Sequence, residues 1–318
     1  MSKKLKVSVC MITYGHEKFI EEAINGVLMQ EVDFDIELIV SNDASPDRTD
    51  EIVKKIIQNH PRSSWIRYIR HESNIGMMLN SKYVLEASEG EFIASCEGDD
   101  YWTDPYKLQK QVDFLENNLD YVICFHKVDI LKTNGQIVED FITKVPENHE
   151  TIETLAQFGN YIHTPSVIFR NVIDKYPFEI KLTPIGDYFL YIILAEFGKI
   201  KYMNDNMAIY RYNVGVISQM SSLDIINNEV AMYSCMLGCI HNEEVKKILL
   251  DKQKNIVTQH YKMLEKTLAK EYEAKELEYK KAFISRHFIF IKIKMFFIYY
   301  NNPRLFLNKV KNKLSKHK

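Results

Sequence analysis

Apolar and polar positions alternate in blocks along the N-terminal part of the chain. Four apolar runs have the length and composition of buried strands; they cover residues 6–13, 36–41, 65–70 and 91–96. Between these runs, apolar residues recur at helical spacing across residues 19–28, 52–57 and 77–87. Strand and helix in alternation, joined by short loops, predict an α/β fold with a mostly parallel, Rossmann-like sheet that helices cover on both faces.

The pattern is less regular after residue 96. The pair Asp104-Pro105 predicts the start of a helix, because Asp caps a helix well and Pro fits its first position. Further strands are predicted at residues 121–132, from 136 to about 142, and at 166–170, 199–203 and 207–212. Further helices are predicted at residues 151–158 and 188–197. We therefore expect a sheet that is no longer purely parallel in its second half.

The C-terminal third has a different pattern. From about residue 225 onward it is helical and densely charged, with helices predicted at 225–249 and 253–281. We therefore expect two parts, an α/β domain over residues 1–215 and a helical C-terminal region over residues 216–318.

The charges are unevenly distributed along the chain. Hydrophobic residues make up 46% and charged residues 26%, which is ordinary globular composition. The formal net charge is only −2, but no acid follows Glu278, whereas eleven Lys and Arg residues do. Removing these eleven positive charges leaves −13 on the remainder, so the sequence describes an acidic body with a basic tail.

The basic tail contains an aromatic, apolar segment at residues 283–300 that includes Arg286, Lys292 and Lys294. This mixture is too charged to span a bilayer and is typical of an anchor on an anionic membrane surface. The alternative is a helix packed on the body or against another subunit, which leaves a homo-oligomer open. Nucleic acid is not an expected partner, because no nucleic-acid-binding module accompanies the basic residues.

Cysteine usage and hydropathy indicate the compartment. The five cysteines form no Cys-x-x-Cys pair and lie mostly in apolar runs, which is typical of reduced, buried thiols. Residues 1–4 lead directly into the first predicted strand without a signal-peptide pattern, and no charge-free stretch reaches about 18 residues. We expect a cytoplasmic protein that is peripheral on the inner face of the cell membrane.

Polar, acid-bearing loops follow the predicted parallel strands, where ligands of such sheets bind. In the loop after the fourth strand, Glu97, Asp99 and Asp100 place three carboxylates within four residues. Such carboxylates repel one another unless a cation joins them, and Mg²⁺ or Mn²⁺ prefers oxygen ligands shared with substrate phosphates. The alternative is a solvated acidic turn that caps the next helix.

The other loops offer candidates for a nucleotide. Asp43 can accept a hydrogen bond from a base or ribose, Tyr14 can stack on a base, and Asn74 and Gly76 can bring backbone close to a phosphate. Each also has a structural interpretation as a turn, cap or packing residue. A Walker-type loop and a Gly-x-Gly-x-x-Gly fingerprint are absent, which argues against a kinase and a Rossmann dehydrogenase.

Taken together, these loops resemble the inverting glycosyltransferases with the GT-A fold, glycosyltransferase family 2. The resemblance extends over residues 5–215. Its motifs are Val-Ser-Val-Cys-Met-Ile-Thr-Tyr at 7–14, Glu-Leu-Ile-Val-Ser-Asn-Asp-Ala-Ser-Pro-Asp at 37–47, Asn-Ile-Gly at 74–76, and Gly-Glu-Phe-Ile-Ala at 90–94 followed by Glu-Gly-Asp-Asp at 97–100.

The resemblance implies roles for several of these residues. Thr13, Tyr14 and Asp43 would hold the nucleoside of the donor. Glu97 and Asp99 would match the two acids of the family's Asp-x-Asp metal motif, with Asp100 beside them. Two departures stand out: the first acid is Glu rather than Asp, and the family's usual Pro-Thr-Tyr-Asn opening reads Ile-Thr-Tyr-Gly at residues 12–15.

The resemblance also implies a general base. Family members place an Asp, usually within Glu-Asp, at the start of a helix late in the domain. Asp187 stands at that point here, although Gly186 replaces the Glu. Its structural interpretation is a helix N-cap. Arg211 is a candidate contact of the diphosphate or a simple salt bridge, and residues 163–166 and 210–212 resemble pocket-lining segments. His126 is either near the metal or a buried core histidine.

These observations predict a hexosyl- or hexosaminyltransferase. The expected donor is a nucleoside-diphosphate sugar, in particular a UDP-sugar, and the acceptor a hydroxyl of a glycan or a lipid-linked acceptor in cell-surface polysaccharide synthesis. Two alternatives stay open. One is a catalytically degenerate scaffold, and the other is a sugar nucleotidyltransferase, although residues 14–17 lack the Gly-rich, basic loop that a triphosphate needs.

Overall fold

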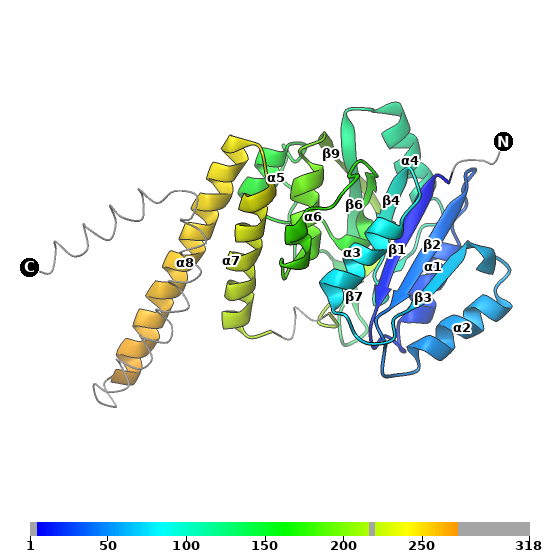
Figure 1. Cartoon of the computed structure of the whole chain (residues 1–318), viewed down its shortest axis with the longest axis horizontal. Coiled ribbons are helices and arrows are strands. Elements are labelled where there is room, and N and C mark those ends of the chain that lie inside the picture. Colours follow the sequence, from blue (N-terminus) through cyan, green and yellow to red (C-terminus); the bar gives the residue numbers. More distant parts are fainter. Residues whose placement is uncertain (1–4, 216–219, 273–318) are drawn as a thin grey trace, which may run out of the picture. The chain divides into compact units, whose positions relative to one another are not determined.

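The computed structural model describes residues 5–215 and 220–272 (Figure 1). The chain divides into two compact units, residues 1–253 and 254–318. The described part of the second unit, residues 254–272, is helical. The domain boundary that the sequence predicts near residue 215 adjoins the undescribed residues 216–219 and stays a prediction.

The N-terminal half alternates strand and helix as the sequence predicts. Its elements are β1 (Val7–Thr13), α1 (Ile20–Leu28), β2 (Ile36–Asn42), α2 (Thr49–Asn59), β3 (Ile66–Arg70), α3 (Met77–Ala87) and β4 (Phe92–Ser95). The four strands are parallel and lie in the order β3-β2-β1-β4. The predicted parallel α/β fold is thus confirmed for this half.

Both faces of strand β1 are covered. Val7, Val9 and Met11 belong to one core cluster together with apolar residues of α1 and of α4 (Lys107–Asn117). Side chains alternate along a strand, so Cys10 lies on the other face, where it borders a small cavity lined also by Val84 of α3. A strand buried on both faces explains why this sequence segment is an unbroken apolar run.

The second half adds strands of both directions to the same sheet. Its elements are β5 (Tyr101–Trp102), α4, β6 (Tyr121–Leu131), β7 (Ile137–Glu139), α5 (Ile152–Phe158), β8 (Ile168–Arg170), α6 (Gly186–Leu194) and β9 (Lys199–Arg211). Short 3-10 helices lie at Ser63–Trp65, Thr164–Ser166 and Phe178–Lys181. The sheet continues as β4-β8-β6-β9-β5, with β7 paired to β6. Strand β8 is antiparallel to both β4 and β6, whereas β9 is parallel to β6.

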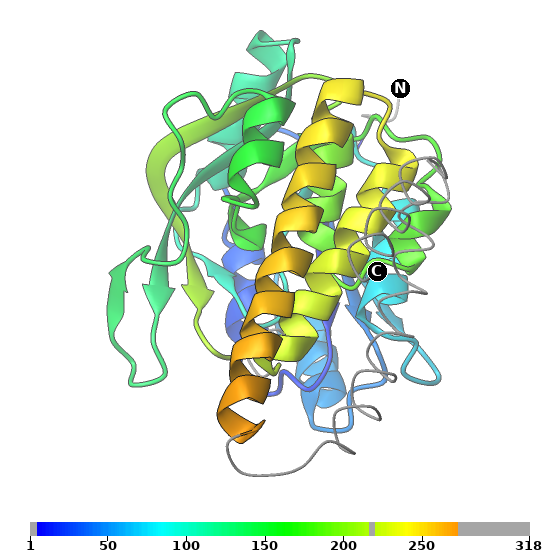
Figure 2. The same ribbon diagram turned by 90° about the vertical axis from the view of Figure 1, so that its left-hand side faces the viewer.

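Two predicted strands, at residues 199–203 and 207–212, are one strand in the structure. Polar residues 204–206 interrupt the apolar pattern, but β9 pairs with β6 on both sides of Asn204 and Asp205, which have no partner in β6. The register shifts next to Lys127, and such a bulge bends a strand while pairing continues. The bend of β9 is visible in Figure 2. The predicted second strand of the hairpin, up to about residue 142, is shorter and ends at Glu139.

Helix boundaries differ from the predictions at several points. Helix α4 begins at Lys107 with Tyr106 as its N-cap, and the Asp104 carboxylate accepts a hydrogen bond from the nitrogen of Tyr106 (2.7 Å) in the turn that precedes the helix. Helix α6 spans Gly186–Leu194 rather than 188–197. The C-terminal helices are α7 (Ser222–Cys239) and α8 (Glu243–Tyr272). Helix α8 begins where the Asn242 side chain accepts hydrogen bonds from the nitrogens of Glu244 (3.0 Å) and Val245 (3.1 Å). The predicted end at residue 281 lies outside the described residues.

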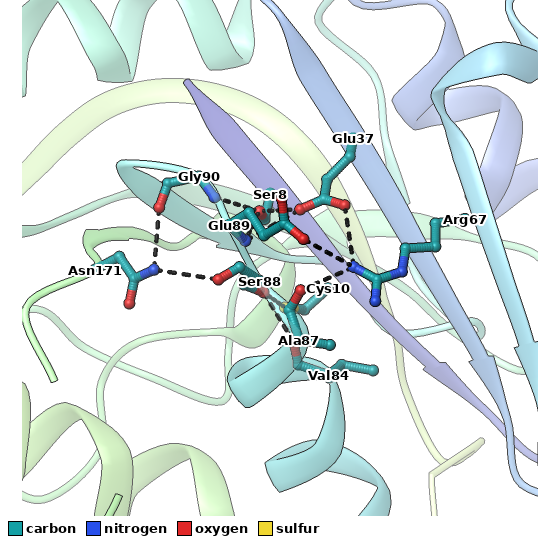
Figure 3. Close-up of polar contacts among 10 residues, drawn as sticks. All are labelled: Ser8, Cys10, Glu37, Arg67, Val84, Ala87, Ser88, Glu89, Gly90 and Asn171. Carbon is teal, nitrogen blue, oxygen red and sulfur yellow. Dashed lines mark hydrogen bonds and ion pairs between the residues drawn. The ribbon is translucent and has the colours of Figure 1, made fainter. Parts of the chain in front are cut away.

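A polar network fixes the turn between α3 and β4 (Figure 3). The buried Ser8 hydroxyl donates to Glu37 (2.6 Å) and accepts from the nitrogen of Gly90 (2.8 Å). Arg67 lies within ion-pair distance of both Glu37 and Glu89. A Cβ atom at position 90 would collide with the backbone of Ser8, so only glycine fits there. The network holds β1, β2 and β3 together near the ends at which these strands begin.

None of the described helices combines the length and apolar character that crossing a bilayer requires. The segment 283–300, for which the sequence predicts a membrane-surface role, lies outside the described residues.

Candidate active site

The loops after β1, β2 and β4 meet at one edge of the sheet. The nitrogen of Gly98 donates to the carbonyl of Ile12 (3.0 Å), and the nitrogen of Asp43 donates to the carbonyl of Thr13 (3.0 Å). A Cβ atom on Gly98 would lie 2.7 Å from the Thr13 hydroxyl oxygen, so the close approach of these loops requires glycine. The sequence predicts this convergence, because carboxyl ends of parallel strands share an edge.

Asp43 organises the loop at residues 74–76. Its carboxylate is buried and accepts hydrogen bonds from the nitrogens of Ile75 (2.7 Å) and Gly76 (2.9 Å). Asn74 also accepts from the Gly76 nitrogen (3.0 Å), and Gly76 has φ of 90°. The structure therefore brings three of the predicted nucleotide-binding residues together, with Asp43 as the anchor of the loop.

The Tyr14 loop is tied to the Asp43 loop. The nitrogen of Gly15 donates to the Ser45 hydroxyl (3.0 Å), and the Thr13 hydroxyl lies 3.2 Å from a ring nitrogen of His16. Thr13 is buried, whereas 48% of Tyr14 is exposed. An exposed aromatic ring beside a fixed loop is available for stacking on a flat ligand.

Beside these loops lies a cavity of about 280 Å³ that three of the candidate acids line. They are Glu97 and Asp99, from the loop after β4, and Asp187, from the first turn of α6. The other lining residues are Ile12, Met77, Met78, Ser81, Ile142, Thr143, Asn160, Ile162, His163, Thr164, Ile185, Gly186, Tyr210 and Gly215. The candidate metal ligands and the candidate base thus face one space.

The acids of this cavity perturb one another. Burial and the negative charges of Asp99 and Asp187 raise the pKa of Glu97 to about 8. Burial also raises the pKa of Asp187, although hydrogen bonds to its carboxylate act in the opposite direction. Clustered carboxylates with raised pKa values are typical of functional sites and of sites that hold a cation.

Asp187 has a defined environment. Its Oδ2 accepts a hydrogen bond from the Asn160 side chain (2.8 Å), and its Oδ1 accepts from the nitrogen of Tyr188 (2.7 Å). The residue that precedes α6 is Ile185, so Asp187 lies within the first turn of the helix and is not its N-cap. The positive end of the helix dipole stabilises a negative charge at this position.

Asp100 and Arg211 support the acidic loop from outside the cavity. Oδ1 of Asp100 accepts a hydrogen bond from the Arg211 nitrogen (2.8 Å), and the Arg211 guanidinium contacts the carbonyl of Asp99 and the carboxylate of Glu22. The same guanidinium lies against the rings of Phe19 and Tyr101. Neither Asp100 nor Arg211 is among the residues that line the cavity.

Two histidines differ in their relation to the cavity. His163 lines it, accompanied by Asp140, whose Oδ2 lies 2.9 Å from His163 Nε2. His126 is buried and borders a different cavity. The structure thus separates His126 from the acids of the candidate metal site.

Sequence reasoning missed several residues of the cavity. Met77, Met78 and Ser81 reach it from the start of α3, directly after the Asn-Ile-Gly motif, and this adjacency was the available signal. Asn160 follows the left-handed Gly159 at the end of α5, and nothing in its sequence context indicates a contact with Asp187.

The oxygen donors of Glu97 and Asp99 suit a hard divalent cation. In residues 5–215 and 220–272, no three His, Cys, Asp or Glu side chains converge as a complete metal-binding group. Mg²⁺ is usually held by one or two carboxylates together with substrate phosphates, so a pair of acids beside a substrate cavity fits such an ion. The raised pKa of Glu97 fits as well, because a cation would relieve the repulsion.

Solved structures share this fold. TarS from S. aureus (residues 1–349, in complex with UDP-GlcNAc) superposes with a TM-score of 0.56 at 21% identity, over 78% of this chain and 71% of that chain. The mannosyltransferase PcManGT from Pyrobaculum calidifontis, in complex with GDP-Man and Mn²⁺, gives a TM-score of 0.57 at 14% identity, over 93% of this chain and 86% of that chain. At these identities the likeness shows the fold alone.

Sequence comparison also identifies relatives of this chain and the family to which it belongs. An uncharacterized protein of Mycobacterium tuberculosis is 35% identical over 205 residues, and the match covers 64% of this chain and 58% of the relative. An uncharacterized glycosyltransferase of Nostoc sp. is 28% identical over 71% of this chain and 70% of its own length. The model of the family described as Glycosyl transferase family 2 matches residues 8–177. Since that match spans more than half of the chain, the protein belongs to glycosyl transferase family 2 and has the GT-A fold of these enzymes.

Proposed function

We propose that this chain is an inverting glycosyltransferase that moves a sugar from a nucleoside-diphosphate sugar, in particular a UDP-sugar, to a hydroxyl of a glycan or lipid-linked acceptor. One observation carries the proposal: Glu97, Asp99 and Asp187 line the same cavity, although they come from the two halves of the domain. A pair of acids for a cation and a separate acid for a proton are the groups that the reaction requires.

In this proposal Asp187 is the general base. Its carboxylate accepts the proton of the acceptor hydroxyl as that oxygen attacks the anomeric carbon of the donor. The bond between the anomeric carbon and the diphosphate oxygen breaks in the same step, and attack from the opposite face inverts the configuration. Burial raises the pKa of Asp187, which increases its basicity, and the Asn160 hydrogen bond orients the carboxylate.

The nucleotide would lie on the side of β1 and β2. Tyr14 would stack on the base, Thr13 and Asp43 would hold the nucleoside, and the backbone at Asn74 and Gly76 would border the phosphates. Glu97 and Asp99 would hold Mg²⁺ or Mn²⁺, which when bound neutralises the negative charge that develops on the departing diphosphate. Asp100 and Arg211 would keep Asp99 in position.

The proposal is tested by titrating the full-length protein with UDP, with and without Mn²⁺, and by assaying UDP-sugars with polysaccharide and lipid-linked acceptors. We expect Asp99→Asn to lose the Mn²⁺-dependent part of UDP binding. We expect Asp187→Asn to bind UDP normally and to lose about 10²–10⁴-fold in turnover. Asp113→Asn, on the exposed face of α4, is the matched control and should behave as the native protein.

The outcomes also separate the alternatives. UDP binding without turnover of any donor would favour a catalytically degenerate scaffold. Absence of UDP binding at every metal condition would contradict the UDP-sugar assignment. Formation of a sugar nucleotide from a sugar phosphate and a nucleoside triphosphate would identify a nucleotidyltransferase.

A further inference from the structure

A small cavity of about 50 Å³ adjoins the larger cavity that the candidate acids line. The two spaces share much of their walls, because Glu97, Gly186 and Asp187 border both. A cavity of about 150 Å³ holds one benzene molecule, so the small cavity has room for a substituent of a sugar and not for a whole sugar ring. None of the roles proposed above uses this space.

The wall that belongs to the small cavity alone is mostly apolar. Its apolar residues are Cys10 of β1, Val84 and Leu85 of α3, Ile180 of the 3-10 helix before α6, and Leu190 of α6, and all are buried. Cys10 and Val84 are drawn in Figure 3. Burial raises the pKa of Cys10 to about 12, so its thiol is neutral and packs as a small apolar group. Such a wall favours an apolar group over a charged one.

A hydroxyl group lies where the two cavities meet. It belongs to Ser81, which borders both cavities and precedes Val84 and Leu85 by one turn of α3. In the part of the chain that the structure describes, no group forms a hydrogen bond with this hydroxyl. It can therefore donate to the carbonyl oxygen of a ligand. An apolar wall with a hydroxyl at its entrance matches a group in which a methyl follows a carbonyl.

Met78 and Gly186 form part of the boundary between the two cavities. A Cβ atom on Gly186 would lie 2.5 Å from Cε and 2.9 Å from Sδ of Met78, so the thioether lies against the backbone of α6. Both residues border both cavities. A methionine side chain is unbranched and flexible, so a ligand can displace its end without moving the backbone. A substituent can therefore enter the small cavity from the space in front of Asp187.

The position of the small cavity selects one part of the donor sugar. In the proposed reaction the anomeric carbon lies in front of Asp187, which borders the small cavity as well. Carbon 2 of the sugar is bonded directly to the anomeric carbon, whereas the ring oxygen and carbon 5 separate carbon 6 from it. A substituent on carbon 2 is therefore the one nearest to the boundary. The negative charges of Glu97 and Asp187 would repel an anionic substituent, so a neutral one is favoured.

We propose that the small cavity receives the acyl group of a 2-acetamido sugar, so that the donor is a nucleoside-diphosphate N-acetylhexosamine. The Ser81 hydroxyl donates to the acyl oxygen, and the methyl group lies against Val84 and Leu85. A 2-hydroxyl group is too small to fill this space, and a protonated 2-amino group would lose its hydration against the apolar wall. The inference rests on the proposed function and narrows its donor from a hexose to an N-acetylated hexosamine.

The test is calorimetry of the full-length protein in the presence of Mn²⁺. The ligands are UDP, UDP-N-acetylglucosamine, UDP-N-acetylgalactosamine, UDP-glucose, UDP-galactose and UDP-glucosamine. We expect an acetamido sugar to bind about tenfold more tightly than its 2-hydroxy counterpart, because a methyl group is buried and a hydrogen bond is gained. Ser81→Ala should lower this preference about threefold and leave the Kd of UDP unchanged.

Two substitutions of Val84 change the size of the small cavity in opposite directions. Val84→Ile adds a methylene group and should remove most of the preference for the acetamido sugar, with the Kd of UDP unchanged. Val84→Ala should bind the N-propanoyl and N-acetyl donors about equally, whereas the native protein should bind the N-propanoyl donor about tenfold more weakly. Val53→Ile, at a buried valine of α2 that borders neither cavity, is the matched control and should keep the native preference.

The outcomes separate this inference from the proposed function. Equal affinity for acetamido sugars and their 2-hydroxy counterparts, in protein that binds UDP with Mn²⁺, would overturn the inference and retain the proposed function. Tightest binding of UDP-glucosamine would overturn it in favour of an amine site. A preference that survives in Val84→Ile, or in Ser81→Ala if the Val84 variants do not fold, would place the acyl group elsewhere. Absence of UDP binding would refute the proposed function and this inference with it.

Discussion

The Asn160 side chain donates a 2.8 Å hydrogen bond to Oδ2 of Asp187, joining the loop after α5 to the first turn of α6. The other carboxylate oxygen accepts from the nitrogen of Tyr188 (2.7 Å). These two hydrogen bonds fix the orientation of the carboxylate. Asp187 thus reaches the cavity in a set direction, which a general base requires.

Replacing Asn160 with Ala should therefore impair turnover more than nucleotide binding. We expect kcat to fall about 10- to 100-fold, because a base that rotates freely is seldom in a reactive orientation, and the Kd of UDP with Mn²⁺ to change little. Steady-state kinetics and calorimetry measure the two quantities, with Asn117→Ala at the exposed end of α4 as the control. A rise in Kd with unchanged kcat would place Asn160 in the nucleotide site instead.

The hydrogen bonds from Ile75 and Gly76 to Asp43 predict that Asp43→Asn loosens the loop at residues 74–76. An Asn side chain has a single acceptor oxygen, so one of the two backbone N–H groups would face its NH₂ group. Ile75 and Gly76 are half-buried, and Gly76 keeps its hydrogen bond to Asn74 (3.0 Å), so the lost hydrogen bond costs about 0.5–1.5 kcal/mol. We expect the Kd of UDP to rise up to about tenfold.

Limited proteolysis supplies an independent measure of the same loop. Cleavage near residue 74 should be faster in Asp43→Asn than in the native protein. Glu72→Gln, in the same loop but exposed, is the control and should match the native protein in both assays. Normal UDP affinity together with faster cleavage would show that the loop is structural only.

The contacts of Arg211 lead us to expect that its replacement lowers both the stability of the fold and the metal-dependent binding of UDP. Its buried guanidinium contacts the Asp99 carbonyl and the Glu22 carboxylate, and its backbone nitrogen binds Asp100. We expect Arg211→Met to lower the free energy of unfolding by about 2–4 kcal/mol and to weaken Mn²⁺-dependent UDP binding. Glu22 is more than half exposed, so Glu22→Gln should cost about 1 kcal/mol or less. Urea unfolding measures the stability of both variants, and calorimetry measures their UDP binding with Mn²⁺. Equal effects of Arg211→Met and Glu22→Gln would contradict the supporting role of the buried Arg211 guanidinium.

The regular half of the fold could be predicted from sequence because each element carries its own pattern. Strands buried on both faces appear as unbroken apolar runs, and α3 was predicted at its observed bounds. Strand β5 could not be predicted, because two residues have no periodicity and Tyr101–Trp102 becomes a strand only by pairing with β9. The sequence also could not show that β9 is one continuous strand, because it continues past polar residues only through its pairing with β6.

The candidate site was predictable where a residue lies directly after a strand or at a helix start. The structure brings Glu97, Asp99 and Asp187 to one cavity, although the family resemblance alone implied a role for Asp187. Prediction from position holds for Glu97 and Asp99. It fails for adjacent acids in an irregular loop: Asp99 lines the cavity, but the neighbouring Asp100 accepts a hydrogen bond from Arg211 behind it. The orientation of the Asp100 side chain depends on Arg211, a residue 111 positions away, and no local sequence pattern indicates this contact.

The buried Lys107 should make the stability of the protein depend on pH. The side chain is fully buried in the core, its Nζ donates to the Gln111 side chain (2.9 Å), and it lies 4.0 Å from the centre of the Trp102 ring. Burial lowers the pKa of Lys107 to about 7 in the folded chain. In the unfolded chain a lysine has a pKa of about 10.4.

Between these two pKa values the unfolded chain binds one more proton at this residue than the folded chain does. Lys107 therefore makes unfolding more favourable near pH 7, and its contribution to stability should rise with pH by up to about 1.4 kcal/mol per unit until about pH 10. Urea unfolding of the native protein and of Lys107→Met at pH 7, 8 and 9 measures this contribution as a difference, in which the titration of all other groups cancels. We expect the native protein to gain stability relative to the variant as pH rises. A difference that stays constant over this range would mean that Lys107 keeps its proton in the folded core, stabilised by Gln111 and the face of Trp102.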